Sequence, residues 1–330
     1  MSSSRVTGDD RRRYDLVTFG ETMIRLTAEP GVRLEETGTL RVTIGGTESN
    51  VAVALARLGR RTTWLSALPD NALGQRIVGE LRRHGVDTTH VLWTSGRMGV
   101  YFMEPGAAPR PTRVLYDRAE SAIARIDPAA LDVSIVGGAG ILHLTGITPA
   151  LSAGCRAACL RLADAAHANG VPVSVDVNYR SRLWSPKQAA EGIQPLLDRA
   201  TLVFCGATDA ETIWGPSGDP AMVAEELLNR SSAEIVVITV GERGSLALTR
   251  DGARHDQPAL PVETIDAVGA GDAFAAGFIH RWLDDATSIP AALASAAALA
   301  ALKMTIYGDN AIITPDDLAL FDQSGPDIDR

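Results

Sequence analysis

Residues 140–178 read GILHLTGITPALSAGCRAACLRLADAAHANGVPVSVDVN, and this stretch decides the fold. It begins and ends with short apolar runs, GILHLTG and PVSVDVN, which predict two buried strands. The segment between them has apolar residues at three- and four-residue spacing and ends at Gly170, which is typical of a helix with a glycine cap. A strand, a helix and another strand in this order predict parallel pairing through a helical crossover.

The same alternation continues on both sides of this stretch. Further strands are expected in YDLVTFG (14–20), TTWLSAL (62–68), TLVFCG (201–206) and EIVVITVG (234–241). Further helices are expected in ESNVAVALARLG (48–59), ALGQRIVGELRRHG (72–85) and AMVAEELLNR (221–230). We therefore predict an α/β fold with a mainly parallel central sheet between two layers of helices. No repeat or low-complexity linker divides it, which predicts one main domain over residues 14–320, a disordered leader at 1–13 and an acidic tail at 321–330.

Two segments, near residues 21–44 and 97–119, break this rhythm. Both alternate apolar and polar residues and contain turn signals, at Pro30-Gly31 and between Glu104 and Pro111. Such alternation predicts strands with one wet face. We expect a small antiparallel sheet that projects from the main domain, with an apolar face that covers either a ligand cleft or a partner subunit.

Composition limits the classes of function. The 330 residues carry a net charge of −9, which disfavours a nucleic-acid partner and means that an anionic substrate needs a local cluster of arginines. Hydrophobic residues make up 45%, yet no apolar run approaches the roughly 18 residues of a membrane span, so no membrane partner is expected. Three cysteines without a secretory leader predict reduced thiols in the cytoplasm, and the spacing of Cys155 and Cys159 favours packing inside one helix.

The stretch DAVGAGDAFAAGF, residues 266–278, carries the first candidate for chemistry. Gly269, Ala270 and Gly271 leave several backbone N–H groups uncovered just where a helix over about 270–282 begins, and such a helix start attracts phosphate. Asp272 would repel phosphate, so it is better suited to accept a proton from an incoming hydroxyl group. The alternative is a glycine loop in which Asp272 only caps the helix.

A second helix also opens on glycines, in IGGTESNVAVALARLG, residues 44–59. Gly45 and Gly46 precede it, and Asn50 on its first turn offers both donor and acceptor groups for sugar hydroxyls, although an ordinary helix start has the same appearance. Together the two elements resemble the signatures of the ribokinase-like (PfkB) carbohydrate kinases, whose late signature is D-x-x-G-A-G-D. The resemblance extends from about residue 14 to 320. A P-loop signature is absent.

The resemblance implies a ribokinase-like three-layer sandwich with a β lid. It implies that Asp272 is the catalytic base and that the amides of Gly269, Ala270, Gly271 and Asp272 form the anion hole. ATP is the implied phosphoryl donor and Mg²⁺ the implied cofactor. The nucleotide would lie along VITVGERGS (237–245), with contacts from Thr239, Gly241, Gly244, Gly269 and Gly271.

Three further positions bear on nucleotide and ions. Lys303 either flanks the adenine or is a solvated lysine. Asp209 stands where the family has the glutamate of an N-x-x-E motif, and here it could hold Mg²⁺ through water, although the asparagine is missing. Asp266 fits the family's acid beside a monovalent-cation loop, which leaves the use of K⁺ open.

Three segments, 113–122, 141–152 and 173–186, resemble the 2-keto-3-deoxygluconate kinases of this family. The resemblance implies that the acid substrate contacts Gly46, Tyr101, Tyr116, Arg118 and Arg180. A substrate carboxylate favours planar guanidinium partners. Asn178 and Arg180 should emerge at the carboxyl end of a buried strand, in the cleft. The alternatives are surface ion pairs for the arginines and sheet packing for the tyrosines, while Glu120 either repels an anion or points into solvent.

The predicted function is therefore ATP-dependent phosphorylation of the terminal hydroxyl of 2-keto-3-deoxygluconate. A fructokinase or another neutral-sugar kinase is the alternative within the class. A sugar-binding regulator would not need Asp272, and an oxidoreductase would need an early G-x-G-x-x-G that the chain lacks. The resemblance also implies a homodimer formed through the lid.

Overall fold

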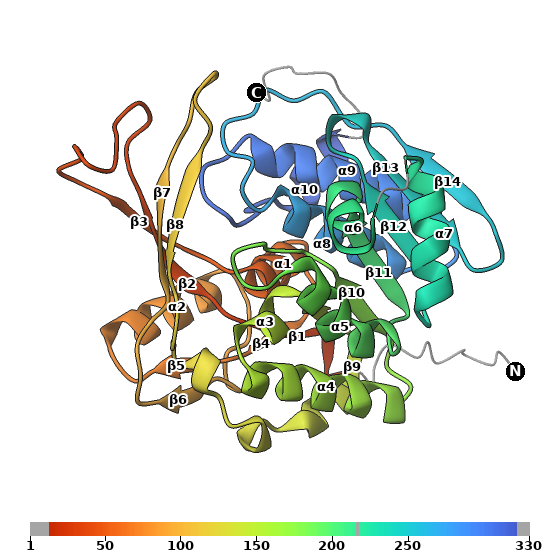
Figure 1. Ribbon diagram of the computed structural model, residues 1–330, viewed down its shortest axis with the longest axis horizontal. Coiled ribbons are helices and arrows are strands. Elements are labelled where there is room, and N and C mark those ends of the chain that lie inside the picture. The colour runs from red at the N-terminus through yellow and green to blue at the C-terminus, as the bar shows by residue number, and fades with distance from the viewer. Residues whose placement is uncertain (1–12, 216–217, 322–330) are drawn as a thin grey trace, which may run out of the picture.

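The computed structural model describes residues 13–215 and 218–321, so nearly all of the predicted leader and tail lies outside the described residues (Figure 1). A central sheet of eight strands has the order β14-β13-β12-β11-β10-β9-β1-β4. Its strands are β1 (Tyr14–Phe19), β4 (Thr62–Leu65), β9 (Ala139–Thr145), β10 (Val173–Asp176), β11 (Leu202–Gly206), β12 (Ile235–Thr239), β13 (Ser245–Thr249) and β14 (Arg254–Gln257). The six expected strands are confirmed, and they pair in parallel.

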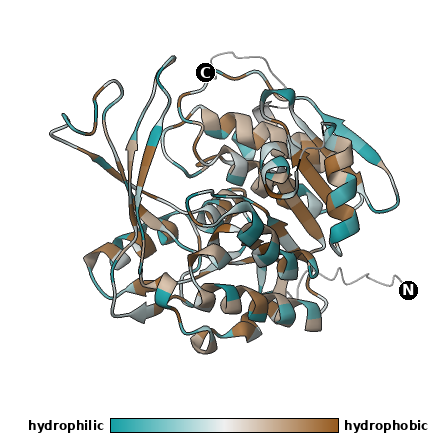
Figure 2. Ribbon diagram, in the orientation of Figure 1, coloured by the Kyte–Doolittle hydropathy of each residue, from teal (hydrophilic) through white to brown (hydrophobic). Residues whose placement is uncertain are grey.

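The edge formed by β13 and β14 was not predicted. Both strands run antiparallel to their neighbours, and β14 has the sequence RHDQ, which contains no apolar residue. An exposed edge strand needs no apolar face, so its sequence lacks the hydrophobic pattern by which a strand is predicted. Figure 2 shows this contrast between hydrophobic central strands and a hydrophilic edge.

Helices cover both faces of the sheet because the central strands other than β10 carry apolar side chains on both sides. On β1, Leu16 belongs to one buried cluster and Val17 to the other. The Leu16 face packs against α1 (Thr47–Arg57), α2 (Ala72–Arg83), α8 (Ala270–Trp282) and α9 (Ile289–Met304). The opposite face packs against α4 (Ala153–Ala168), α5 (Pro186–Leu197) and α7 (Pro220–Arg230). Cys155 and Cys159 are fully buried in α4, which confirms their packing role.

The smaller sheet, called the lid below, projects from this body (Figure 1). Its order is β3-β2-β7-β8, from β2 (Met23–Thr27), β3 (Arg41–Gly45), β7 (Val100–Glu104) and β8 (Arg113–Asp117). Each of the pairs β2–β3 and β7–β8 is antiparallel, and the pairs join through parallel contacts between β2 and β7. The lid segments thus lie within the two stretches in which the sequence alternates.

The remaining elements are short connections. They are β5 (Ala67–Pro69), β6 (Leu92–Thr94), α3 (Ile147–Leu151), α6 (Ala207–Trp214), α10 (Pro315–Phe321) and 3₁₀ turns at Ile123–Arg125, Pro128–Ala130, Val133–Gly138 and Gly241–Arg243. Within residues 13–215 and 218–321, no helix has both the length and the apolar character needed to cross a membrane.

Candidate active site

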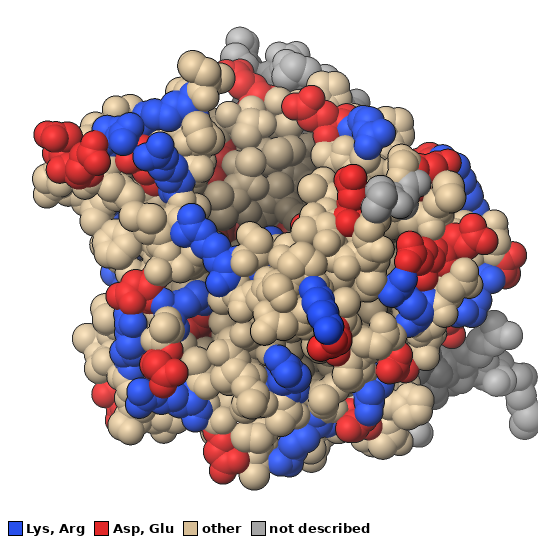
Figure 3. Space-filling view, in the orientation of Figure 1, with Lys and Arg blue, Asp and Glu red and all other residues tan. Residues whose placement is uncertain are grey.

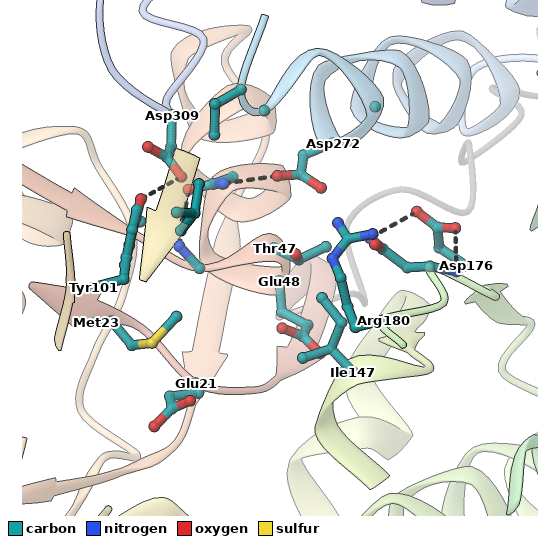
Figure 4. A pocket seen from close by; sticks show the side chains of 18 of the residues that line it. Glu21, Met23, Thr47, Glu48, Tyr101, Ile147, Asp176, Arg180, Asp272 and Asp309 are labelled. Carbon is teal, nitrogen blue, oxygen red and sulfur yellow. Dashed lines mark hydrogen bonds between the residues drawn. The ribbon is translucent and has the colours of Figure 1, made fainter. Parts of the chain in front are cut away.

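A cavity of about 460 Å³ lies between the lid and the carboxyl ends of the central strands. Figure 3 shows the hollow from outside, and Figure 4 shows the side chains of its wall. Residues that the sequence singled out and that line this cavity are Gly45, Gly46, Asn50, Tyr101, Tyr116, Arg118, Asn178, Arg180, Asp209, Thr239, Gly269, Gly271 and Asp272. The position agrees with the rule that open α/β sheets bind ligands beyond the carboxyl ends of their strands.

The mouth of α8 is open toward this cavity. Gly269 caps the helix with a left-handed φ of 84°, and no side chain of the residues that the structure describes caps the free amides of the first turn. A Cβ added to Gly271 would meet nothing within 4 Å, so the space beside this backbone is unobstructed. Within the described chain, the amides of Gly271 and Asp272 have no backbone acceptor. Bare amides and the positive end of the helix dipole make this mouth a suitable anion-binding site.

Asp272 faces the cavity from the first turn of α8 and is only 8% exposed. Its Oδ2 accepts a hydrogen bond of 2.7 Å from Asn50 Nδ2, while the Gly46 amide donates to Asn50 Oδ1 at 3.3 Å. The carboxylate is therefore oriented by Asn50 rather than used as a cap for its own helix. Sequence reasoning expected Asn50 to bind sugar hydroxyls, and the structure additionally places it as the partner of the candidate base.

Burial raises the pKa of Asp272 to about 7, and the negative charges of Asp309 and Glu48 act in the same direction. The hydrogen bond from Asn50 and the charge of Arg180 oppose this rise in pKa. A carboxylate with a pKa near the working pH is well suited to accept a proton.

This pKa leads to a prediction about pH. Only the deprotonated carboxylate can accept a proton, so kcat/KM is expected to rise with pH and to reach half of its plateau near the pKa of about 7. The measurement is kcat/KM between roughly pH 5.5 and pH 8.5, since this parameter reports the groups of the free enzyme. A profile that stays flat across this interval would contradict the assignment of Asp272 as the base.

Two further carboxylates, those of Asp176 and Asp209, line the same cavity. Asp176 ends β10, and burial together with the charges of Asp272 and Asp209 raises its pKa to about 8. Asp209 accepts a hydrogen bond of 3.1 Å from the Tyr179 amide, and burial raises its pKa as well. Hard carboxylate oxygens are the ligands that Mg²⁺ prefers, so this pair fits that ion. Sequence reasoning missed Asp176, although it lies in the same DVNYR segment as two predicted residues.

The two predicted arginines differ in their partners. Arg118 Nε donates to Glu21 Oε2 at 2.7 Å, and Ser121 donates to the other oxygen of Glu21. Arg180 Nη1 instead donates to the Tyr179 carbonyl at 3.0 Å, and no carboxylate of the described residues lies within ion-pair distance of it. Figure 4 shows its side chain reaching toward the same space as Asp272. Arg180 is thus the cation of this wall that remains available to an anionic ligand.

The two predicted tyrosines and Glu120 differ in their exposure and in their partners. Tyr101 is buried and donates to Asp309 Oδ2 at 2.7 Å, whereas Tyr116 is 42% exposed and its ring centroid lies 5.7 Å from that of Tyr101. Glu120 pairs with Arg125 at the surface, with 72% of its side chain exposed, so it points into solvent.

Some predicted nucleotide and ion residues lie outside the cavity lining. Thr239 lines it, but Gly241 and Gly244 do not. A Cβ at Gly244 would lie 2.1 Å from the Gln257 carbonyl oxygen, which explains this glycine by packing. Lys303 is fully buried, so its interpretation as a solvated lysine is wrong. Asp266 forms a buried ion pair of 2.7 Å with Arg25.

Sequence comparisons agree with this site. Residues 13–316 match the family described as pfkB family carbohydrate kinase. The 2-dehydro-3-deoxygalactonokinase of Haloferax volcanii is 43% identical over 92% of this chain and 95% of its own length. The 2-dehydro-3-deoxygluconokinase of Bacillus subtilis is 32% identical over 94% of this chain and 95% of its own length.

A structural comparison gives the same result. The solved 2-dehydro-3-deoxygluconokinase of Thermotoga maritima superposes with a TM-score of 0.89 at 32% identity, covering 95% of this chain and 100% of its own. The chain belongs to the pfkB family of carbohydrate kinases. It is an ATP-dependent sugar kinase with the ribokinase-like fold.

Proposed function

We propose that this protein, in one kinase domain over residues 14–320, transfers the γ-phosphoryl group of ATP to the terminal hydroxyl of 2-keto-3-deoxygluconate. The observation that carries the proposal is one cavity that holds a buried carboxylate at an open helix mouth together with the guanidinium of Arg180, which has no carboxylate within ion-pair distance among the described residues. The relatives named above are kinases of 2-dehydro-3-deoxy sugar acids, which is another name for the 2-keto acids.

The residues divide the chemistry among them. Asp272 accepts the proton of the sugar hydroxyl while the hydroxyl oxygen forms its bond to the γ-phosphorus, and the bond from that phosphorus to ADP breaks. The amides of Gly271 and Asp272 stabilise the negative charge on the transferred group, whereas the Ala270 amide already donates to the Ala267 carbonyl at 3.2 Å. Mg²⁺, when bound beside Asp176 and Asp209, supplies positive charge that neutralises the phosphates.

Arg180 supports an acid substrate over a neutral sugar. A carboxylate can form charge-assisted bonds with a guanidinium, and such bonds are worth about 1.5–3 kcal/mol each. Asn178 stands beside it with a left-handed φ of 38°, a conformation that asparagine tolerates better than most residues and that turns the chain into the cavity. Tyr116 and Gly46 line the same cavity.

A panel of acceptors tests the proposal. ADP release should be measured with 2-keto-3-deoxygluconate, its C4 epimer 2-keto-3-deoxygalactonate, fructose and ribose. We expect kcat/KM for the better of the two acids to exceed that for fructose by at least tenfold, the factor expected from about 1.5 kcal/mol. Fructose turning over faster than both acids would refute the proposal and favour the neutral-sugar alternative.

We also propose a homodimer formed through the outer face of the lid. Val42, Leu26, Phe102 and Leu115 are neighbours in register across its four strands, on the face opposite Tyr101 and Met103. Val42 is 40% and Leu115 53% exposed, so a second copy would cover apolar surface. Light scattering that finds a monomer at micromolar concentration would contradict the dimer.

The free, buried thiols of the three cysteines support a reducing compartment such as the cytoplasm.

A further inference from the structure

Lys303 is the most deeply buried charged side chain near the anion hole. It lies on α9 and has no exposed surface. Its Nζ donates to the backbone carbonyl of Asp266 at 2.7 Å and lies 3.5 Å from the carbonyl of Ile306. A buried amine without partners would be costly, so these carbonyl oxygens account for its position. The proposed mechanism leaves this residue without a role.

The residue that Lys303 holds begins the loop of the anion hole. Asp266 Oδ1 accepts from the Val268 amide at 3.0 Å, and Oδ2 accepts from the Gly308 amide at 3.1 Å. Arg25 pairs with the same carboxylate. Both the backbone carbonyl and the carboxylate of Asp266 are therefore held in place. The amides of the anion hole come shortly after this residue in the chain, at Gly271 and Asp272.

The Lys303 ammonium group is surrounded by backbone carbonyl oxygens, the type of ligand that also binds alkali-metal ions. Backbone carbonyl oxygens can replace the hydration shell of K⁺. Here two carbonyls face the ammonium, with the carboxylates of Asp266 and Asp309 acting on its charge. A K⁺ ion at the carbonyl oxygen of Asp266 would compete with Lys303 for that oxygen and would be repelled by a positive charge at contact distance. The residues present therefore do not fit a monovalent cation at this place.

We propose that the Lys303 side chain serves as a tethered monovalent cation that positions the anion-hole loop, so that this kinase works without added K⁺. Lys303 is then a positioning residue, acting on phosphoryl transfer through Asp266. This inference rests on the proposed function only for its activity measurements, because ion binding can also be measured through thermal stability.

The first test uses the unaltered protein. Its kcat and its thermal midpoint should be measured in K⁺, Na⁺ and choline chloride at equal ionic strength. We expect kcat to agree within about twofold and the midpoint to be unchanged, since an ion that bound only the folded protein would raise it. A K⁺ stimulation of tenfold or more, or a midpoint that rises specifically with K⁺, would overturn the proposal. The midpoint decides this even if the substrate assignment fails.

The second test replaces Lys303 by a side chain of similar length without charge. In Lys303→Met, kcat is expected to fall by about tenfold or more, less than the 10²–10³-fold loss for a direct anion-hole donor. KM for the sugar should change by less than about threefold, because a group that acts on the transition state affects kcat. Lys187→Met is the matched control, since Lys187 is highly exposed and should leave both parameters unchanged.

The kcat of Lys303→Met either supports or refutes a positioning role for Lys303. A folded Lys303→Met protein with unchanged kcat would refute a positioning role. If the variant does not fold, the cation profile of the unaltered protein still supports or overturns the proposal by itself.

Discussion

Asp272→Asn is expected to lower kcat by about 10²–10⁴-fold, which is the contribution of a positioned general base. Asparagine has nearly the same shape and can keep the hydrogen bond that Asn50 donates at 2.7 Å, but its amide cannot take up the sugar proton. The effect should therefore appear in kcat, with little change in KM. Coupled ADP release with the preferred acid is the measurement, and a loss smaller than tenfold would refute the assignment.

Stability separates this catalytic effect from misfolding. The pKa of Asp272 is raised by burial to about 7, above its ordinary value of 3.8, so the ionised carboxylate opposes folding once the pH exceeds that range. The asparagine variant is thus expected to unfold at an equal or higher temperature at pH 8. Asp70→Asn is the control, because Asp70 is exposed and is not one of the residues that line the cavity, and both the activity and the thermal midpoint of this variant should stay unchanged.

The sequence was sufficient to predict those parts of the structure in which a local pattern of residues has a single physical cause. Continuous apolar runs such as residues 235–238 predict strands buried on both faces, and β12 confirms this, because Ile235 and Val237 belong to one buried cluster and Val236 and Ile238 to the other. The glycines before Asp272 predicted an open helix mouth, because glycine has no side chain that could cover the neighbouring backbone amides. These features required no knowledge of distant partners.

Buried charges were the features that could not be predicted. A glutamate is usually exposed, and only its partners show otherwise. Glu48 is buried because Thr145 and Thr148 donate to it at 2.7 and 2.6 Å, from about 100 positions along the chain. Glu21 likewise becomes the partner of Arg118 across 97 positions, so the sequence could not show that this arginine is already paired.

Gly269→Ala is expected to lower kcat by about 10²–10³-fold, comparable to the loss of an anion-hole donor. The added Cβ would lie 2.0 Å from the backbone oxygen of Asp309, and the φ of 84° is a left-handed conformation that costs an L-residue roughly 1–2 kcal/mol. Since backbone cannot move aside as a flexible side chain can, the loop and its amides must shift. The measurement is kcat for the preferred acid, together with circular dichroism to verify the fold.

The consequence should extend to the sugar side of the cavity, because Asp309 also accepts hydrogen bonds from Tyr101 and Arg25. A displaced Asp309 would disturb the lid face, so KM for the acid should rise in Gly269→Ala, whereas Asp272→Asn should leave KM nearly unchanged. Gly79→Ala is the matched control, since nothing lies within 4 Å of a Cβ at this position on α2 and alanine favours helices. A Gly269→Ala protein that is folded and retains kcat within threefold would show that phosphoryl transfer does not depend on this helix mouth.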